Sequence, residues 1–157
     1  MDVARLVAHL RQTGKTVTTA ESCTGGMVAA AITDIAGSSN VFEEGVVTYS
    51  NDVKIRLLGV NPDTLDAFGA VSEQVAREMA AGARAASGAD IAISVSGIAG
   101  PGASEYKPEG RVCFAVTDGE GFFSETKEFG AIGRANVRRE ARDHALRLIA
   151  YASGLAP

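Results

Sequence analysis

Apolar positions along the chain follow a helical period at first and then change to the pattern of a strand. Leu6, Val7 and Leu10 recur at helical spacing, which predicts a first helix over residues 2–13. The segment at residues 16–20 is short and rich in β-branched side chains, as expected for a buried strand. This change of period predicts that a helix and a strand follow each other directly.

The same two patterns alternate along the rest of the chain. Short apolar or β-branched segments predict strands at residues 42–49, 91–96, 111–116 and 122–129. The last two flank Asp-Gly-Glu-Gly, a hairpin signal that makes them antiparallel neighbours. Helical spacing and capping residues, with Asn51 and Asn61 as two of the caps, predict helices at residues 27–35, 51–58, 62–68, 72–86 and 134–149. The order of elements predicts an α/β fold, a three-layer α/β/α sandwich with a mixed, mostly parallel sheet.

The composition limits the classes of protein to which the chain can belong. Its 157 residues, of which 46% are hydrophobic and 22% charged, suit one globular domain over residues 1–157. The net charge of −4, without a basic cluster, argues against nucleic acid as a partner. No apolar run approaches the roughly 20 residues of a bilayer-spanning helix, so we expect no membrane insertion.

The cysteines indicate the compartment and the kind of chemistry. Cys23 and Cys113 lie far apart, and the chain opens on an amphipathic segment rather than on a charged-then-apolar leader. We therefore expect a cytoplasmic protein with reduced thiols. Together with His9 and His144, the cysteines show no paired zinc-ligand spacing. The chemistry then uses ordinary side chains, or carboxylates that hold a hard cation.

The turn after the first predicted strand carries the most informative motif, Glu-Ser-Cys-Thr-Gly-Gly. The backbone N–H groups of Thr24, Gly25 and Gly26 are expected at a new helix N-terminus without internal partners, which is an anion-binding geometry. Ser22 would lie within reach of these donors and could attack a carbonyl whose oxyanion they stabilise. Two alternatives stay open: Ser22 or Thr24 caps the helix, or Cys23 is the nucleophile.

A base for this nucleophile is hard to find among the histidines. His9 and His144 both fall inside predicted helices, where a structural role is the favoured interpretation. A lysine with a lowered pKa is the economical alternative. Lys54 lies in the first turn of a helix that follows a strand, where ligand sites of α/β folds are found. It could equally be an ordinary solvated lysine, and Lys107, in a long loop, could bind a phosphate.

Two further features could bind an anion. The segment Ser-Gly-Ile-Ala-Gly-Pro-Gly, which begins at Ser96, would let backbone amides approach an oxyanion or a phosphate. It lacks the Gly-Lys-Ser/Thr ending of a P-loop, and a structural turn is an equal alternative. Arg134 and Arg138 lie four residues apart on the final helix. They could present paired guanidinium groups to a phosphate or form a solvated face.

Five separated motifs together resemble one protein family. They are Ala-Glu-Ser-Cys-Thr-Gly-Gly from Ala20, Tyr-Ser-Asn from Tyr49 with Lys54, Gly-Ala-Val-Ser from Gly69, Gly-Ile-Ala-Gly-Pro-Gly from Gly97, and Lys-Pro from Lys107 with Gly110. In this order the chain resembles the C-terminal amidase domain of the competence/damage-inducible protein CinA. The resemblance implies an α/β/α sandwich that hydrolyses nicotinamide mononucleotide to nicotinate mononucleotide and ammonia. It implies that this small pyridine nucleotide is recycled without a metal or an organic cofactor.

The resemblance also implies roles for individual residues. Ser22 matches the nucleophile, Lys54 the residue that activates it, and Tyr49 a neighbour that orients the pair. The backbone amides after Ser22 would hold the oxyanion. Contacts with the substrate are implied for Thr24, Gly25, Gly26, Asn51, Ser96, Gly97, Arg134 and Arg138, with the two arginines assigned to its phosphate.

The chain departs from the family in the glycine-rich loop. Ala-Ser-Glu, ending at Glu105, replaces a more glycine-rich continuation, and Glu109 adds negative charge near the site for a phosphorylated substrate. The chain resembles the stand-alone form of the domain, without the N-terminal nucleotide-binding domain of longer CinA proteins. The alternative functions are a non-catalytic nucleotide-binding or regulatory module and a structural partner in a larger assembly. The Ala-rich helices would suit a homodimer or a higher homo-oligomer.

Overall fold

The computed structural model describes residues 1–156, in which five strands form one sheet. The strands are β1 (Val17–Glu21), β2 (Phe42–Val47), β3 (Ile91–Gly97), β4 (Arg111–Thr117) and β5 (Phe122–Glu128). Their order across the sheet is β2-β1-β3-β4-β5. β1 pairs in parallel with β2 and β3, and β4 pairs antiparallel with β3 and β5. Four of the five strands therefore run in one direction, which confirms the mixed, mostly parallel sheet.

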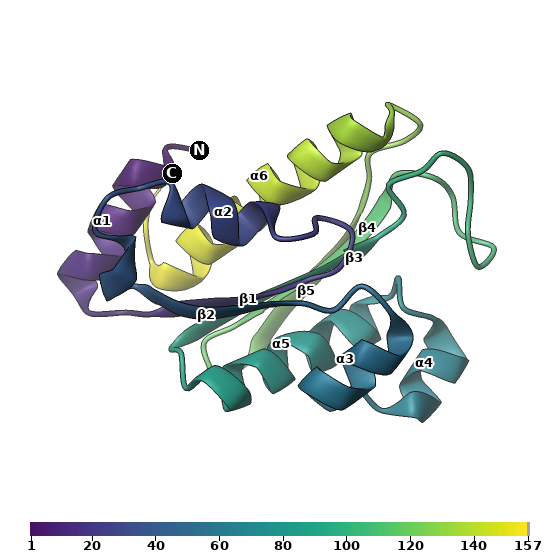
Figure 1. Ribbon diagram of the computed structural model, residues 1–157, viewed down its shortest axis with the longest axis horizontal. Coiled ribbons are helices and arrows are strands. Elements are labelled where there is room, and N and C mark those ends of the chain that lie inside the picture. The colour runs from purple at the N-terminus through teal and green to yellow at the C-terminus, as the bar shows by residue number, and fades with distance from the viewer. Residues whose placement is uncertain (157) are drawn as a thin grey trace.

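Helices cover both faces of this sheet, so the three-layer sandwich is confirmed (Figure 1). One layer contains α1 (Val3–Thr13), α2 (Met27–Thr33) and α6 (Arg134–Ser153), and the other contains α3 (Asn51–Leu58), α4 (Pro62–Phe68) and α5 (Glu73–Ser87). A short 3-10 helix, η1 (Ser38–Asn40), precedes β2. None of the helices within residues 1–156 is long and apolar enough to cross a membrane.

Each face of the sheet has its own hydrophobic core, and the central strand β3 contributes to both. Ile93 and Val95 pack in the core beneath α1, α2 and α6. Ala92 belongs to the core beneath α5, where Met79 is also fully buried. Because successive side chains of a strand point to opposite faces, a strand covered on both sides is apolar throughout. This explains the largely apolar segment that predicts the strand, in which the two buried serines, Ser94 and Ser96, donate to backbone carbonyls.

Local capping sets most helix boundaries as the sequence predicts, with one difference. Asn61 caps α4 through its side chain, and Ser72 caps α5. The cap of α3 is Ser50, whose hydroxyl accepts the backbone N–H of Val53, and not Asn51, which is the first helical residue. A serine in extended conformation directly before the helix is the better acceptor, because an N-cap residue must lie outside the helix.

The parallel strands determine where the functional residues meet. β1, β2 and β3 run in one direction, so their carboxyl ends lie at the same edge of the sheet. Ser22 follows β1, Tyr49 lies just beyond β2, and Gly97 ends β3. This edge is where ligands bind in open α/β sheets. The long connection between β3 and β4 extends beyond the sheet at the same end (Figure 1).

Candidate active site

Ser22 and Lys54 form a buried hydrogen-bonded pair at this edge. Lys54 Nζ donates to Ser22 Oγ at 2.9 Å, although 32 positions separate the two residues in the chain. The same ammonium group donates to the carbonyl of Thr48 at 2.7 Å. The Lys54 residue is 1% exposed, so its interpretation as a solvated helical lysine is wrong. Lys54 lies at the start of α3, after β2, and its amine points back to residues 21–26. This segment carries the candidate nucleophile Ser22 and is called the nucleophile turn below.

Burial changes the acid–base behaviour of this lysine. Desolvation lowers the pKa of Lys54 from 10.5 to about 8, while the negative charge of Glu105 acts in the opposite direction. A pKa near 8 leaves an appreciable fraction of the amine neutral at neutral pH. A neutral amine in contact with a hydroxyl has the geometry and the basicity required of a general base.

The nucleophile turn is held by Glu21, a residue whose role the sequence patterns did not reveal. Its carboxylate is 1% exposed and accepts the backbone N–H groups of Gly26, Val28 and Ala29 at 3.2, 2.9 and 3.0 Å. A carboxylate at a helix N-terminus satisfies orphan donors and complements the helix dipole. The sequence signal was present, an acidic residue at the end of an apolar strand and directly before a glycine-rich helix start.

These contacts correct the expectation of free amides for two of the three predicted residues, Gly25 and Gly26, whereas no acceptor for the backbone N–H of Thr24 is found within residues 1–156. The N–H of Gly25 donates to the carbonyl of Ser22 at 3.0 Å, and that of Gly26 donates to Glu21. Neither Ser22 nor Thr24 caps α2, because the helix has no side-chain cap at its N-cap residue, Gly26. Within residues 1–156 no other residue accepts the backbone N–H of Cys23, and Cys23 lines the cavity.

A cavity of about 340 Å³ lies beside the Ser22–Lys54 pair, a size that suits a small ligand. It brings together most of the predicted site residues, namely Ser22, Tyr49, Asn51, Lys54, Ser96, Gly97 and Arg134. The loop after β3 supplies much of the remaining wall. Thr24, Gly25, Gly26 and Arg138 are not among the residues that line it. Thr24, Gly25 and Gly26 therefore lie behind Ser22 rather than in the cavity wall.

The two arginines of α6 have different surroundings. Arg134 lines the cavity, and its guanidinium donates to the carbonyl of Gly100 at 2.7 Å and to the Tyr49 hydroxyl at 2.8 Å. Arg138 instead donates to the carbonyls of Cys23 and Thr24 at 3.1 and 3.2 Å. The predicted arginine pair is thus divided between the cavity and the back of the nucleophile turn. One guanidinium, not two, faces the ligand space.

Three other predicted residues have structural contacts that limit their roles. The Tyr49 hydroxyl contacts Arg134, and Lys54 Nζ reaches only the Tyr49 backbone carbonyl, at 3.5 Å. The Ser96 hydroxyl donates to the carbonyl of Ala70 at 2.8 Å, which ties β3 to the connection between α4 and α5. A Cβ on Gly97 would lie 2.6 Å from Val112 Cγ2 and 2.9 Å from the Arg111 carbonyl, so the pairing of β3 with β4 requires a glycine there.

The rival nucleophile and the histidines lack the properties that catalysis needs. Burial raises the pKa of Cys23 to about 12, so the residue stays a thiol at neutral pH. His9 contacts the carbonyl of Ser153. His144 contacts Glu125, packs against Phe114 and has its pKa lowered chiefly by burial. These contacts support the structural interpretation of both histidines.

Removal of the Cys23 thiol is expected to leave catalysis nearly intact. Cys23→Ala keeps the backbone amide and removes a group that stays protonated, so kcat should change by no more than about threefold. The change in kcat is measured by comparing steady-state rates of the variant with those of the unmodified protein. A loss of several hundredfold would make the thiol, and not Ser22, the nucleophile.

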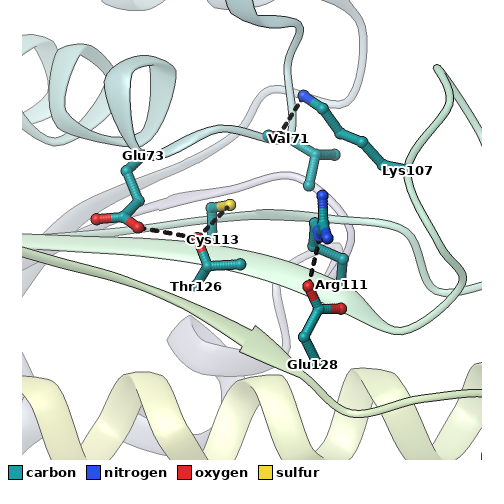
Figure 2. Close-up of polar contacts among 7 residues, drawn as sticks. All are labelled: Val71, Glu73, Lys107, Arg111, Cys113, Thr126 and Glu128. Carbon is teal, nitrogen blue, oxygen red and sulfur yellow. Dashed lines mark hydrogen bonds and ion pairs between the residues drawn. The ribbon is translucent and has the colours of Figure 1, made fainter.

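Lys107 is an anchor of the long loop and not an element of the cavity wall. Its ammonium donates to the backbone carbonyl of Phe68, the last residue of α4, and to that of Val71, between α4 and α5. Figure 2 shows the contact with Val71. It borders a second cavity, of about 400 Å³. Polar groups around that cavity pair with one another: Cys113 with Thr126, Thr126 with Glu73, and Arg111 with Glu128 (Figure 2). The interpretation of Lys107 as a phosphate ligand therefore loses its support.

The chain is similar to known proteins over most of its length. Residues 2–152 match the family described as the CinA C-terminal domain. The nicotinamide-nucleotide amidohydrolase PncC of Escherichia coli (strain K12) is 54% identical over 141 residues, covering 89% of this chain and 86% of that protein. A CinA-like protein of Chloroherpeton thalassium is 50% identical over 83% of this chain and 32% of its own length. The crystal structure of the competence/damage inducible protein CihA from Agrobacterium tumefaciens has a TM-score of 0.93 at 44% identity, over 96% of this chain and 93% of that one.

Proposed function

Since this chain belongs to the CinA C-terminal domain family, we propose that it is an amidohydrolase that converts nicotinamide mononucleotide and water into nicotinate mononucleotide and ammonia. The observation that carries the proposal is the contact of Ser22 with the buried Lys54 at the edge of the cavity. Relatives that are 54% identical are named for an amidohydrolase of nicotinamide nucleotides. A serine and a lysine of lowered pKa are a sufficient pair for acyl transfer.

In the proposed reaction Lys54 transfers protons and Ser22 carries the acyl group. Neutral Lys54 Nζ accepts the hydroxyl proton of Ser22 while Oγ bonds to the carboxamide carbon. The backbone N–H of Cys23 donates to the resulting oxyanion. Lys54 then gives its proton to the leaving nitrogen, the C–N bond breaks, and ammonia departs. Water attacks the ester with Lys54 again as base, which releases the nicotinate product and restores the Ser22 hydroxyl.

Ammonia release from nicotinamide mononucleotide tests the proposal directly. We expect turnover with the nucleotide and much weaker turnover with nicotinamide riboside and free nicotinamide, which lack the phosphate. Ligand-induced thermal stabilisation without ammonia would instead identify the non-catalytic nucleotide-binding module. Neither turnover nor stabilisation would favour a structural partner in an assembly.

Arg134 is expected to bind the phosphate of the substrate, since its guanidinium is the one that lines the cavity. Arg134→Met should raise KM for nicotinamide mononucleotide by about tenfold or more and leave the weak reaction of nicotinamide riboside almost unchanged. Arg138→Met is the matched control, because Arg138 supports the turn from behind. That variant should lower kcat for both substrates alike. An equal loss for both substrates in Arg134→Met would contradict the phosphate role.

The pH dependence of the reaction should follow the titration of Lys54. The neutral amine is the active form, and its pKa is about 8, so kcat/KM should rise with pH, pass its midpoint near 8 and level off above it. Below the midpoint, kcat/KM should fall by nearly tenfold for each unit by which the pH is lowered. Initial rates of ammonia release between pH 6 and 10 measure this. A rate that is independent of pH in this range would reject Lys54 as the base.

A further inference from the structure

The active-site cavity contains charges of both signs. Its lining includes two cationic side chains, Lys54 and Arg134, and one carboxylate, that of Glu105. Lys54 contacts the nucleophile, and Arg134 lies where α6 meets Tyr49 and Gly100. The reaction proposed above assigns a task to both cations and none to Glu105. A carboxylate in the cavity of an enzyme for phosphorylated substrates needs a separate explanation.

The loop that carries Glu105 is held in place by contacts on both sides of this residue. Ser104 and Lys107 exchange two backbone hydrogen bonds, at 3.1 and 2.8 Å. The Lys107 ammonium is anchored to the connection between α4 and α5 (Figure 2). The Glu105 carboxylate packs over Gly69 in the same connection, where a Cβ would lie only 2.6 Å from Oε2. The carboxylate therefore lies against Gly69, next in the chain to Ala70 and Val71, which line the cavity with Glu105.

Glu105 also opposes the chemistry that Lys54 must perform. Its negative charge raises the pKa of Lys54, against the lowering by burial. The groups that face the amine are the Cys23 thiol and the Ser22 hydroxyl from the nucleophile turn, the carbonyl of Thr48, and Glu105 from the loop, with Arg134 beyond Tyr49. In the free enzyme the carboxylate therefore favours the inactive, protonated lysine. The Lys107 ammonium lies against the same face of Gly69 as this carboxylate, and a cationic ligand in the cavity would offset the negative charge further.

We propose that Glu105 is a specificity-determining residue that binds the positively charged pyridinium ring of the substrate, an inference that rests on the proposed function. The charges of the cavity then match those of the ligand, with Arg134 at the anionic phosphate, Glu105 at the cationic ring and the neutral carboxamide at Ser22. Once the ring lies against Glu105, its charge cancels that of the carboxylate. The substrate thereby favours the neutral form of the lysine that attacks it.

A comparison of charged and neutral rings tests this role. In a Ser22→Ala background, which prevents turnover, calorimetry at low salt measures Kd for nicotinamide mononucleotide and for its neutral phenyl-carboxamide isostere. We expect the charged ring to bind about three- to fivefold more tightly than the neutral one, the scale of an exposed ion pair. Glu105→Gln should abolish this preference, and Glu105→Asp should retain part of it. Loss of affinity for both ligands by the same factor, or for neither, would overturn the role of Glu105.

Glu109→Gln is the matched control for disturbance of the loop. It removes the same charge four residues away, where the carboxylate accepts the Gly102 N–H at 2.8 Å and does not line the cavity. Any effect of this variant should be equal for the two ligands. Active Glu105→Gln should also show a lower midpoint in its kcat/KM profile than the unmodified protein. Ammonia release by the unmodified protein is measured first: no release rejects the proposed function and this role with it, whereas release with an unchanged ring preference rejects the role of Glu105 alone.

Discussion

Lys54→Met is expected to lower kcat for ammonia release by about 10³- to 10⁴-fold, because the variant lacks the group that accepts the Ser22 proton. Methionine has a similar length and fills the same buried space without a charge. Ser22→Ala should be at least as severe, and the double variant should be no worse than the more severe single variant, since the two residues act as a unit. Retention of more than a tenth of the activity by Lys54→Met would show that another group is the base.

The same variant should be more stable than the unmodified protein at neutral pH, which separates loss of catalysis from loss of folding. The pKa of Lys54 is about 8 in the folded protein and 10.5 as an unperturbed side chain, so folding disfavours the charged amine. We expect Lys54→Met to raise the free energy of unfolding at pH 7 by about 1–3 kcal/mol. The unfolded chain binds more protons between these two pKa values, so the stability of the unmodified protein rises with pH there. The advantage of the variant should therefore shrink between pH 8 and 10.5 in denaturant titrations.

Glu21→Ala is expected to have the largest destabilising effect of the variants considered, about 2–4 kcal/mol. The substitution removes the acceptor for three backbone N–H groups at the start of α2 and leaves a cavity between that helix and β1. The turn that carries Ser22 should loosen, so kcat should fall as well. Urea denaturation measures the first effect, and ammonia release measures the second.

Glu21→Gln is the matched variant for this prediction. Its side-chain carbonyl can still accept from α2, but its amide group presents donors where the carboxylate accepted, so the loss of stability should be intermediate. Stability equal to that of the unmodified protein in both variants would show that the carboxylate does not hold the turn.

Much of the secondary structure could be predicted from the sequence because its causes are local. The apolar period within one segment determines whether a helix or a strand can bury one face, and Ser72 and Asn61 satisfy backbone donors within their own turns. The motif around Ser22 and the position of Lys54 after a strand likewise indicated a site at a strand end. Their direct contact needed the parallel pairing of β1 with β2, which joins segments that are distant in the chain.

The sequence by itself determined the helices and strands, the α/β class and the turn that holds the two candidate nucleophiles, Ser22 and Cys23, since each depends on residue types within a short stretch of chain. Only the tertiary structure decided which polar groups already have hydrogen-bond partners within the protein. Arg134 and Arg138 share one helix and one residue type, yet one lines the cavity and the other holds the nucleophile turn. Glu21 begins the turn motif by pattern, yet in the structure it ends β1 and its carboxylate accepts backbone N–H groups of α2. Hydrogen-bonding capacity and desolvation depend on neighbours brought together by folding, so no spacing along the chain can specify them.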